Sequence, residues 1–150
     1  MRVRAGIILI ENSKLALIER FRAGTHYFAI PGGGVDKGET PEQAAVREAE
    51  EELGLRVKIK QRIAQVNIGQ AGRQEYYLVE SIGGEFGTGT GDEMSNLHPD
   101  DPNEGIHIPV WMPVDELADH DNVYPAGVAK LVMTSLAEGW PKEAVVIEEK

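Results

Sequence analysis

One short stretch constrains the fold more than any other part of the chain: a glycine-rich segment leads directly into a helix with one carboxylate face. Thr40 followed three residues later by Gln43 is typical of a capping box, and Pro41 suits the first helical position. Gly54 is a natural end just past the last turn. The sequence therefore predicts a helix over residues 41–53, entered from a loop that can bend sharply.

The predicted helix has two distinct faces at 3.6 residues per turn. One stripe is expected to face the core, and its members are Ala45, Val46, Ala49 and Leu53. A separate arc carries Glu48, Glu51 and Glu52, with Ala44 inside it and Arg47 at its edge. Such glutamates repel one another, and many acidic helix faces are simply solvated. Beside a glycine loop and an arginine, however, they predict an oxygen-ligand site for Mg²⁺ or Mn²⁺, which turns repulsion into coordination.

This stretch resembles the Nudix box, Gly-x5-Glu-x7-Arg-Glu-U-x-Glu-Glu-x-Gly-U, in which U is usually a bulky aliphatic residue. The fixed places are filled by Gly33, Glu39, Arg47, Glu48, Glu51, Glu52, Gly54 and Leu55. Ala49 stands at the first U and is smaller than usual, which leaves the catalytic positions intact. Residues 29–32 and 111–117 also look typical of the family. The resemblance therefore covers most of the chain, although only the box is diagnostic.

Patterns outside the box predict a mixed α/β fold. Strands are expected at 3–10, 15–20, 26–30, 56–68, 73–82 and 106–112, and a second helix at about 125–138. Strands interrupted by two helices imply helices on both faces of a sheet. The Nudix resemblance implies the same α/β/α sandwich, with a mixed, largely antiparallel-paired sheet. We expect residues 1–150 to form a single Nudix hydrolase domain, in which residues 144–147 add an edge strand, fold back or fray.

Composition narrows the expected partners. With no cysteine, the chain has neither a disulfide scaffold nor a thiolate metal site. A net charge of −10 argues against nucleic-acid binding but not against an anionic small substrate, because bound Mg²⁺ would reverse the local field. The apolar run at 5–10 is too short to span a membrane or to form a signal-peptide core. We expect no membrane partner, a cytoplasmic location and, as a candidate assembly, a homodimer.

The resemblance implies a Mg²⁺-dependent enzyme, with Mn²⁺ as a substitute, that cuts a nucleoside diphosphate linked to another group by attack of water on phosphorus. Its implied metal ligands are Glu51, Glu52 and the backbone of Gly32. In this family the carboxylate at Glu48 is either a ligand or the general base, and both roles stay open here.

The other positions of the box have supporting roles. Arg47 is expected to hold a glutamate in position rather than to clamp substrate. Glu39 is expected to fix the loop against the helix. Gly33 and Gly54 are structural places of the box.

Candidates outside the box are less specific. Related enzymes often carry a base or an extra ligand at a place matching Glu104, and Glu93 and Asp92 compete with it; for each, a solvated loop is the alternative. The glycine-rich segment 83–105 is either a substrate-covering flap or a flexible insertion, and it lacks a P-loop pattern. Candidates for substrate contact, each weighed against a core or surface role, are Arg20, Arg22, Tyr27, Phe28 and Arg73.

The sequence decides the substrate only coarsely. It lacks the proline and the tyrosine that follow the box in the ADP-ribose and diadenosine polyphosphate groups. Residues 31–34 read Pro-Gly-Gly-Gly, whereas RNA pyrophosphohydrolases usually show Pro-Gln-Gly-Gly. A nucleoside triphosphate is slightly preferred over a nucleotide sugar. The alternative function is a non-catalytic Nudix-fold nucleotide-binding or sensor module, which the complete set of box carboxylates disfavours.

Overall fold

The computed structural model describes residues 2–70, 72–89 and 106–149. Its strands are β1 (Arg2–Glu11), β2 (Lys14–Arg22), β3 (Thr25–Ala29), β4 (Gly32–Gly34), β5 (Leu55–Ile68), β6 (Gly72–Gly84), β7 (Ile106–Pro113), β8 (Val123–Tyr124) and β9 (Val145–Glu149). Its helices are α1 (Pro41–Leu53), the 3-10 helix η2 (Val114–Asp119) and α2 (Ala126–Glu138). Within the described ranges, no helix has both the length and the apolar character needed to cross a membrane.

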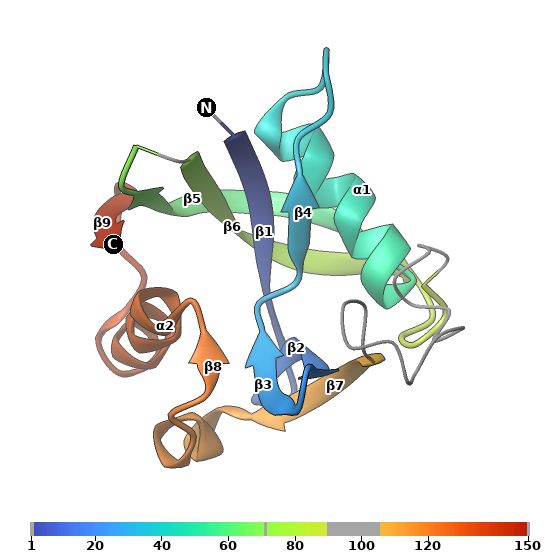
Figure 1. Cartoon of the computed structure of the whole chain (residues 1–150), viewed down its shortest axis with the longest axis vertical. Coiled ribbons are helices and arrows are strands. Elements are labelled where there is room, and N and C mark those ends of the chain that lie inside the picture. The colour runs from blue at the N-terminus through green and yellow to red at the C-terminus, as the bar shows by residue number, and fades with distance from the viewer. Residues whose placement is uncertain (1, 71, 90–105, 150) are drawn as a thin grey trace.

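The strands form one nine-stranded sheet in the order β8-β3-β2-β1-β6-β5-β9, with β4 paired to β1 and β7 paired to β2 (Figure 1). Parallel pairing joins β1 to β6, β3 to β8 and β5 to β9, and the remaining pairs are antiparallel. The predicted mixed, largely antiparallel-paired sheet is therefore confirmed. Of the three alternatives for the C-terminal segment, the structure has the edge strand: β9 lies along residues 64–68 of β5.

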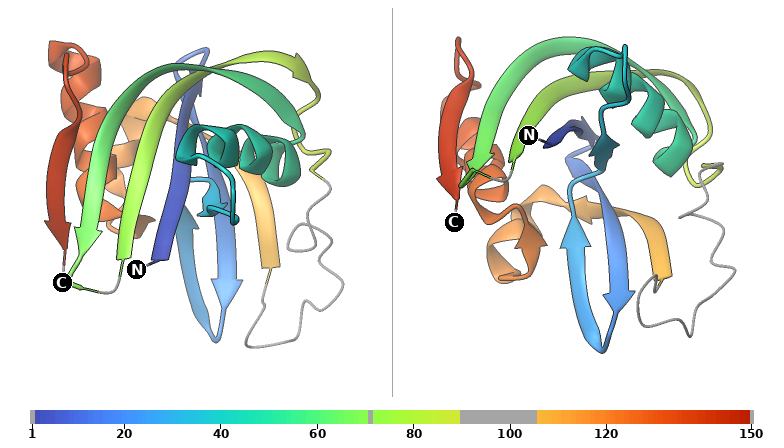
Figure 2. Two further views of the ribbon diagram at one scale, coloured as in Figure 1. Left: turned by 90° about the horizontal axis from the view of Figure 1, so that it is seen from above. Right: turned by 45° about the horizontal axis from the view of Figure 1, so that its top comes forward.

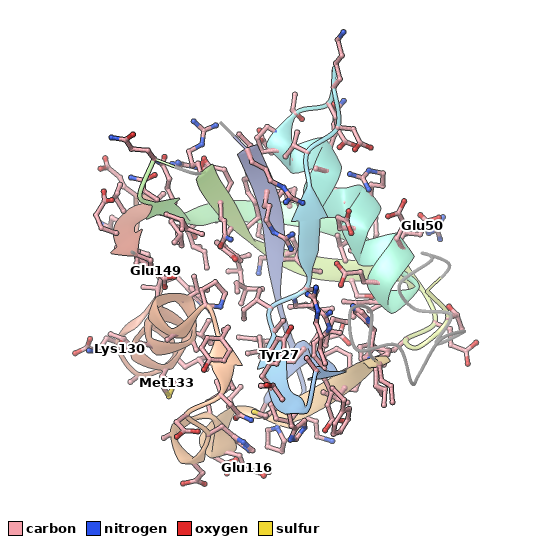
Figure 3. The ribbon with its side chains drawn as sticks, in the orientation of Figure 1. Tyr27, Glu50, Glu116, Lys130, Met133 and Glu149 are labelled. Atoms are coloured by element: carbon pink, nitrogen blue, oxygen red, sulfur yellow. The ribbon has the colours of Figure 1, made fainter. Side chains whose placement is uncertain are left out.

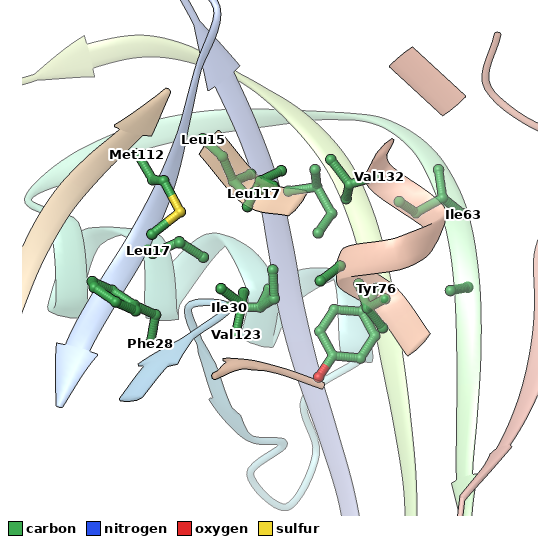
Figure 4. Packing of buried hydrophobic residues seen from close by; sticks show 14 of the residues in the cluster. Leu15, Leu17, Phe28, Ile30, Ile63, Tyr76, Met112, Leu117, Val123 and Val132 are labelled. Carbon is green, nitrogen blue, oxygen red and sulfur yellow. The ribbon is translucent and has the colours of Figure 1, made fainter. Parts of the chain in front are cut away.

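The two long helices cover opposite faces of the sheet (Figure 2). Successive residues of a strand point to opposite faces, and β1 shows this alternation clearly. Ile7 and Leu9 pack in a cluster with buried residues of α1, whereas Ile8 belongs to a second cluster that includes buried residues of α2. Figure 4 shows this second cluster, in which Tyr76, Ile63 and Val132 come from three different elements. The predicted α/β/α sandwich is confirmed.

Helix α1 has the predicted ends but a different buried face. The Thr40 hydroxyl accepts from the Gln43 amide at 3.1 Å, the Gln43 side chain accepts from the Thr40 amide at 2.9 Å, and Gly54 adopts φ 78° at the C-terminus. The prediction that Val46 faces the core is wrong, because Val46 is 37% exposed while Ala44 is fully buried. The reason is tertiary: β4 lies against the side of α1 that carries Glu48 and so turns part of the predicted carboxylate arc into buried surface.

Two short strands, β4 and β8, were not predicted. Three glycines form β4, although glycine has little intrinsic preference for strands. Its pairing with β1 places Gly32 opposite Gly6 and Gly34 opposite Arg4. The approach is close enough that a Cβ on Gly32 would lie 2.4 Å from the Ala5 carbonyl oxygen. Contact with β1, rather than local preference, therefore makes this segment extended.

The packing of α1 can be tested at Leu53, which is fully buried in its last turn. We expect Leu53→Ala to lower the free energy of unfolding by about 2–5 kcal/mol, because a large side chain is removed from a filled core. Leu136→Ala is the matched control, since Leu136 is on α2 and 43% exposed; its cost should stay below about 1 kcal/mol. Urea denaturation measures both, and equal losses would contradict the assigned burial.

Candidate active site

Arg47 is the centre of a hydrogen-bond network between α1 and the glycine-rich segment. Its Nε and Nη2 donate to the two carboxylate oxygens of Glu39 at 2.9 and 3.0 Å, in the bidentate geometry that favours arginine. Its Nη1 donates to Glu48 at 2.9 Å and to Glu51 at 3.1 Å, while Nη2 also reaches the Gly34 carbonyl at 2.9 Å. One guanidinium therefore links β4, the loop before α1 and two carboxylates of α1.

Glu39 ties the loop to this network. Besides receiving both bonds from Arg47, its Oε1 accepts the Asp36 amide at 3.0 Å. The Asp36 carboxylate itself lies 3.5 Å from the Arg47 guanidinium. These bonds, that from Arg47 first, lower the pKa of Glu39. The Glu39 carboxylate thus fixes the loop before α1 against the helix.

Strand β4 touches the carboxylates of α1 directly. The Gly32 amide donates to Glu52 Oε1 at 2.9 Å, and its carbonyl accepts a longer bond from Arg4 Nη2 at 3.4 Å. A Cβ on Gly33 would lie 2.3 Å from Glu48 Oε1. Any side chain at this position would therefore have to displace the Glu48 carboxylate.

The buried carboxylates of α1 share a common environment. Glu48 and Glu52 are 8% and 5% exposed, and their side chains are hydrogen-bonded to each other. Burial raises the pKa of Glu48, and the charge of Glu51 adds to this; the bonds from Glu52 and Arg47 oppose it without cancelling it. The hydrogen bond to Glu39 is the main cause that raises the pKa of Arg47. The site therefore pairs a permanently charged guanidinium with a carboxyl that holds its proton unusually well.

The donors at this site suit a hard divalent cation in their chemistry, since they are carboxylate and carbonyl oxygens. Hydrogen bonds connect the predicted ligand residues: Arg47 bonds to Glu48 and Glu51, and the Gly32 amide bonds to Glu52. In the ranges that the structure describes, no three or more His, Cys, Asp or Glu side chains are gathered in a metal-holding arrangement. Each bond from Arg47 or from the Gly32 amide engages one carboxylate oxygen of its glutamate.

Two of the predicted substrate residues lie on the sheet face that α1 covers. Arg20 and Tyr27 are opposite each other on β2 and β3, and the Arg20 guanidinium carbon lies 5.6 Å from the centre of the Tyr27 ring. Ile18, two residues from Arg20, packs in the α1-side cluster, so alternation puts Arg20 on that face. Tyr27 is labelled in Figure 3. Arg22, at the end of β2, is exposed.

The other predicted residues are placed differently. Phe28 is buried in the cluster on the opposite face. Arg73 forms an ion pair with Glu75 at 3.4 Å. The candidate carboxylates Glu104, Glu93 and Asp92, and most of segment 83–105, lie outside the described residues.

Three contributors at the site were missed by the sequence reasoning. Tyr124 is 48% exposed and contacts the Tyr27 ring edge-on, with centroids 6.0 Å apart. The sequence gives only a weak indication of this contact, namely an aromatic residue directly before the proline at the start of the second helix. No local sequence pattern indicates that Arg4 donates to the Gly32 carbonyl or that the Gly34 carbonyl accepts from Arg47. Both contacts depend on the position of β4, which its pairing with β1 sets.

The chain is similar to proteins of a known family. The family model described as NUDIX domain matches residues 1–131. An RNA pyrophosphohydrolase of Pseudoalteromonas translucida is 47% identical over 55 residues, which is 37% of this chain and 31% of that protein. The chain thus spans about a third of the length of the curated relatives it matches.

Solved structures share the fold over nearly the whole chain. A NUDIX hydrolase from Nitrosomonas europaea aligns with a TM-score of 0.74 at 20% identity, covering 99% of this chain and 79% of that one. MutT, from a study of the Aliivibrio salmonicida and Vibrio cholerae proteins, aligns with a TM-score of 0.67 at 22% identity, covering 89% and 98%. At these identities the likeness concerns the fold.

The role of Glu39 predicts a specific pH dependence of stability. Its pKa is lowered in the folded protein, so its contribution is present above the ordinary value of 4.5 and is lost as the pH falls through the folded value. Glu39→Gln should therefore lower the Tm at pH 7, and the difference from wild type should shrink below about pH 4.5. Thermal melts from pH 3 to 7 measure this. Glu50→Gln, on the exposed side of α1, is the control; a pH-independent difference for Glu39→Gln would contradict the assigned bonds.

Proposed function

Because the chain belongs to the NUDIX domain family, we propose that it is a pyrophosphohydrolase that cuts the phosphoanhydride bond of a nucleoside diphosphate linked to another group. The observation that carries this proposal is the Arg47-centred network, which holds the carboxylates of α1 against the glycine strand β4. Such a concentration of carboxylates beside a backbone strand has no evident structural benefit, since like charges close together cost stability. It is useful when a cation and phosphates are to be bound.

The proposed cofactor is Mg²⁺, with Mn²⁺ as a substitute. Glu51, Glu52 and the Gly32 carbonyl are the groups that would hold it, and Glu48 would join them if another carboxylate is the general base. When bound, the cation supplies charge neutralisation at the phosphates and a water of lowered pKa. Hard oxygen donors and the absence of cysteine from the chain support this choice.

The chain's own residues supply position and proton transfer. Arg47 fixes the carboxylates relative to β4 through its bonds to Glu48, Glu51 and the Gly34 carbonyl. Water is proposed to attack phosphorus and to give its proton to a carboxylate. Glu48 suits this role because burial raises its pKa toward the working range of a general base. Glu104 and Glu93 remain the competing bases, in which case Glu48 serves as a ligand.

The proposed substrate is an anionic nucleotide, with a nucleoside triphosphate slightly preferred over a nucleotide sugar. Arg20 offers a cation for phosphate, and Tyr27 with the exposed Tyr124 offers aromatic surface for a base. The RNA pyrophosphohydrolase of Pseudoalteromonas translucida matches only 37% of the chain. RNA is therefore included only as one of the substrates to be tested. A cytoplasmic location, a homodimer, and the lack of nucleic-acid and membrane partners stay predictions.

A hydrolysis screen tests the proposal. Phosphate and pyrophosphate release would be measured for nucleoside triphosphates, nucleotide sugars and a 5′-triphosphate RNA, each with and without Mg²⁺. Turnover of one class identifies the substrate. Tight nucleotide binding without turnover of any class would favour the sensor module instead.

The first expected outcome concerns the metal. Activity should vanish in EDTA and return when Mg²⁺ or Mn²⁺ is added, because the proposed mechanism needs the cation both to neutralise the phosphates and to lower the pKa of the attacking water. The measurement is the initial rate of metal-stripped protein across a cation titration. Undiminished hydrolysis by metal-free protein would overturn the mechanism.

The second expected outcome concerns Glu52. Glu52→Gln keeps an oxygen that can accept from the Gly32 amide but removes the charge, so kcat should fall by about a hundredfold or more, the scale of losing one major electrostatic contact. The Tm of the metal-free protein should stay level or rise, since a repulsive carboxylate is gone. Glu50→Gln is the matched control, because this exposed neighbour on α1 (labelled in Figure 3) carries the same charge. A Glu52→Gln enzyme with wild-type kcat at saturating Mg²⁺ would remove Glu52 from the site.

A further inference from the structure

The C-terminal end of α1 is held by residues 84–89, which we call the clasp. The Gly87 amide donates to the Leu53 carbonyl at 2.9 Å, and the Glu85 amide donates to the Gly54 carbonyl at 3.2 Å. Within the clasp, Thr88 Oγ1 donates to the Glu85 carbonyl at 2.6 Å. The last carbonyls of a helix lack partners inside it. The clasp therefore satisfies the end of the same helix that carries Glu51 and Glu52.

The clasp also presses on the backbone of these two glutamates. A Cβ on Gly89 would lie 2.3 Å from the Glu51 carbonyl oxygen and within 3 Å of the carbonyl group of Glu52. A Cβ on Gly54 would lie 2.2 Å from Thr88 Oγ1. The clasp backbone therefore lies so close to the backbone of Glu51 and Glu52 that a side chain on Gly89 would have to displace one of them.

An aromatic pair attaches the clasp to the sheet as well. The Phe86 ring stacks on Trp111, with centroids 4.5 Å apart and planes at 26°. Trp111 lies on β7 opposite Ala16 of β2, and both rings pack against the α1-side cluster. The clasp that bonds to the end of α1 is therefore also attached to strand β7.

We propose that Phe86 and Trp111 are positioning residues for the metal-binding carboxylates Glu51 and Glu52. This inference rests on the proposed function. Through the clasp, the stacked pair fixes the distance between the end of α1 and the sheet, and hence the place of the two carboxylates. Outer-sphere partners of metal ligands typically change metal affinity by about 10- to 100-fold when removed, and site geometry is sensitive to shifts of about 1 Å.

The test compares substitutions in two stacked aromatic pairs, Phe86–Trp111 and Phe21–His26. Phe86→Leu should raise the Kd for Mn²⁺, measured by calorimetry on the full chain well below its Tm, by about tenfold, and Phe86→Tyr should restore wild-type binding. Phe21→Leu is the matched control, because Phe21 stacks on His26 with centroids 4.4 Å apart on the β2–β3 hairpin; it should bind Mn²⁺ like wild type. A Phe86→Leu protein with lower Tm but wild-type Kd, or an equal loss in Phe21→Leu, would overturn the proposal.

A second variant covers the case in which Phe86→Leu folds poorly. Gly89→Ala keeps both rings but sets a methyl against the Glu51 carbonyl, so it should also weaken Mn²⁺ binding by about tenfold; wild-type affinity would count against the clasp.

A wild-type protein that binds no Mn²⁺ would overturn the proposed function instead. In that case, amide hydrogen exchange in wild type and Phe86→Leu tests the clasp independently of metal binding. Faster exchange at the amides of Gly54 and Gly87 in Phe86→Leu supports it, and unchanged exchange overturns it.

Discussion

The Arg47 guanidinium is the interaction on which the rest of the site depends. Helix α1 buries two glutamates, Glu48 and Glu52, on a face that an ordinary amphipathic helix would cover with apolar side chains. Removing a charged carboxylate from water is strongly unfavourable unless it is paired and hydrogen-bonded. Arg47 has five donors in a fixed plane and uses them on Glu48 and Glu51 of α1, on Glu39 and on the Gly34 carbonyl, while Glu52 accepts from the Gly32 amide. Without this cation the buried acidic face would repel itself.

The glycine strand β4 is the second requirement. Its backbone must lie close to β1 on one side and to the carboxylates of α1 on the other, and side chains would prevent both contacts. The amide of Gly32 then becomes a donor to Glu52, so the strand supplies hydrogen bonds as well as space. The end of α1 is held by a different element, the clasp, so that both ends of the carboxylate face are anchored to the sheet. A face that is held at both ends loses little order when it binds a ligand, which suits the proposed metal site.

The sequence predicted some of these features and missed others for identifiable reasons. The ends of α1 were predicted correctly because the Thr40–Gln43 box and Gly54 act within a few residues of each end. The prediction that Val46 faces the core was wrong. Helical periodicity shows which residues share a face of the helix, but not which elements cover each face. Strand β4 was missed because three glycines have no strand signal of their own. The sequence allows three alternatives for the C-terminal segment, and the pairing of β9 with β5 decides among them.

The sequence by itself determined which carboxylates share one side of α1, where that helix begins and ends, and that a single arginine stands beside them. These properties depend on helical spacing and on caps, which are local along the chain. Only the tertiary structure decided which oxygen bonds to which donor, which face of α1 is buried, and which aromatic rings stand near the site. Arg4 and Gly32 are 28 residues apart, and Gly32 and Glu52 are 20 apart. Contacts between such distant residues depend on strand register and layer packing, which no local pattern encodes.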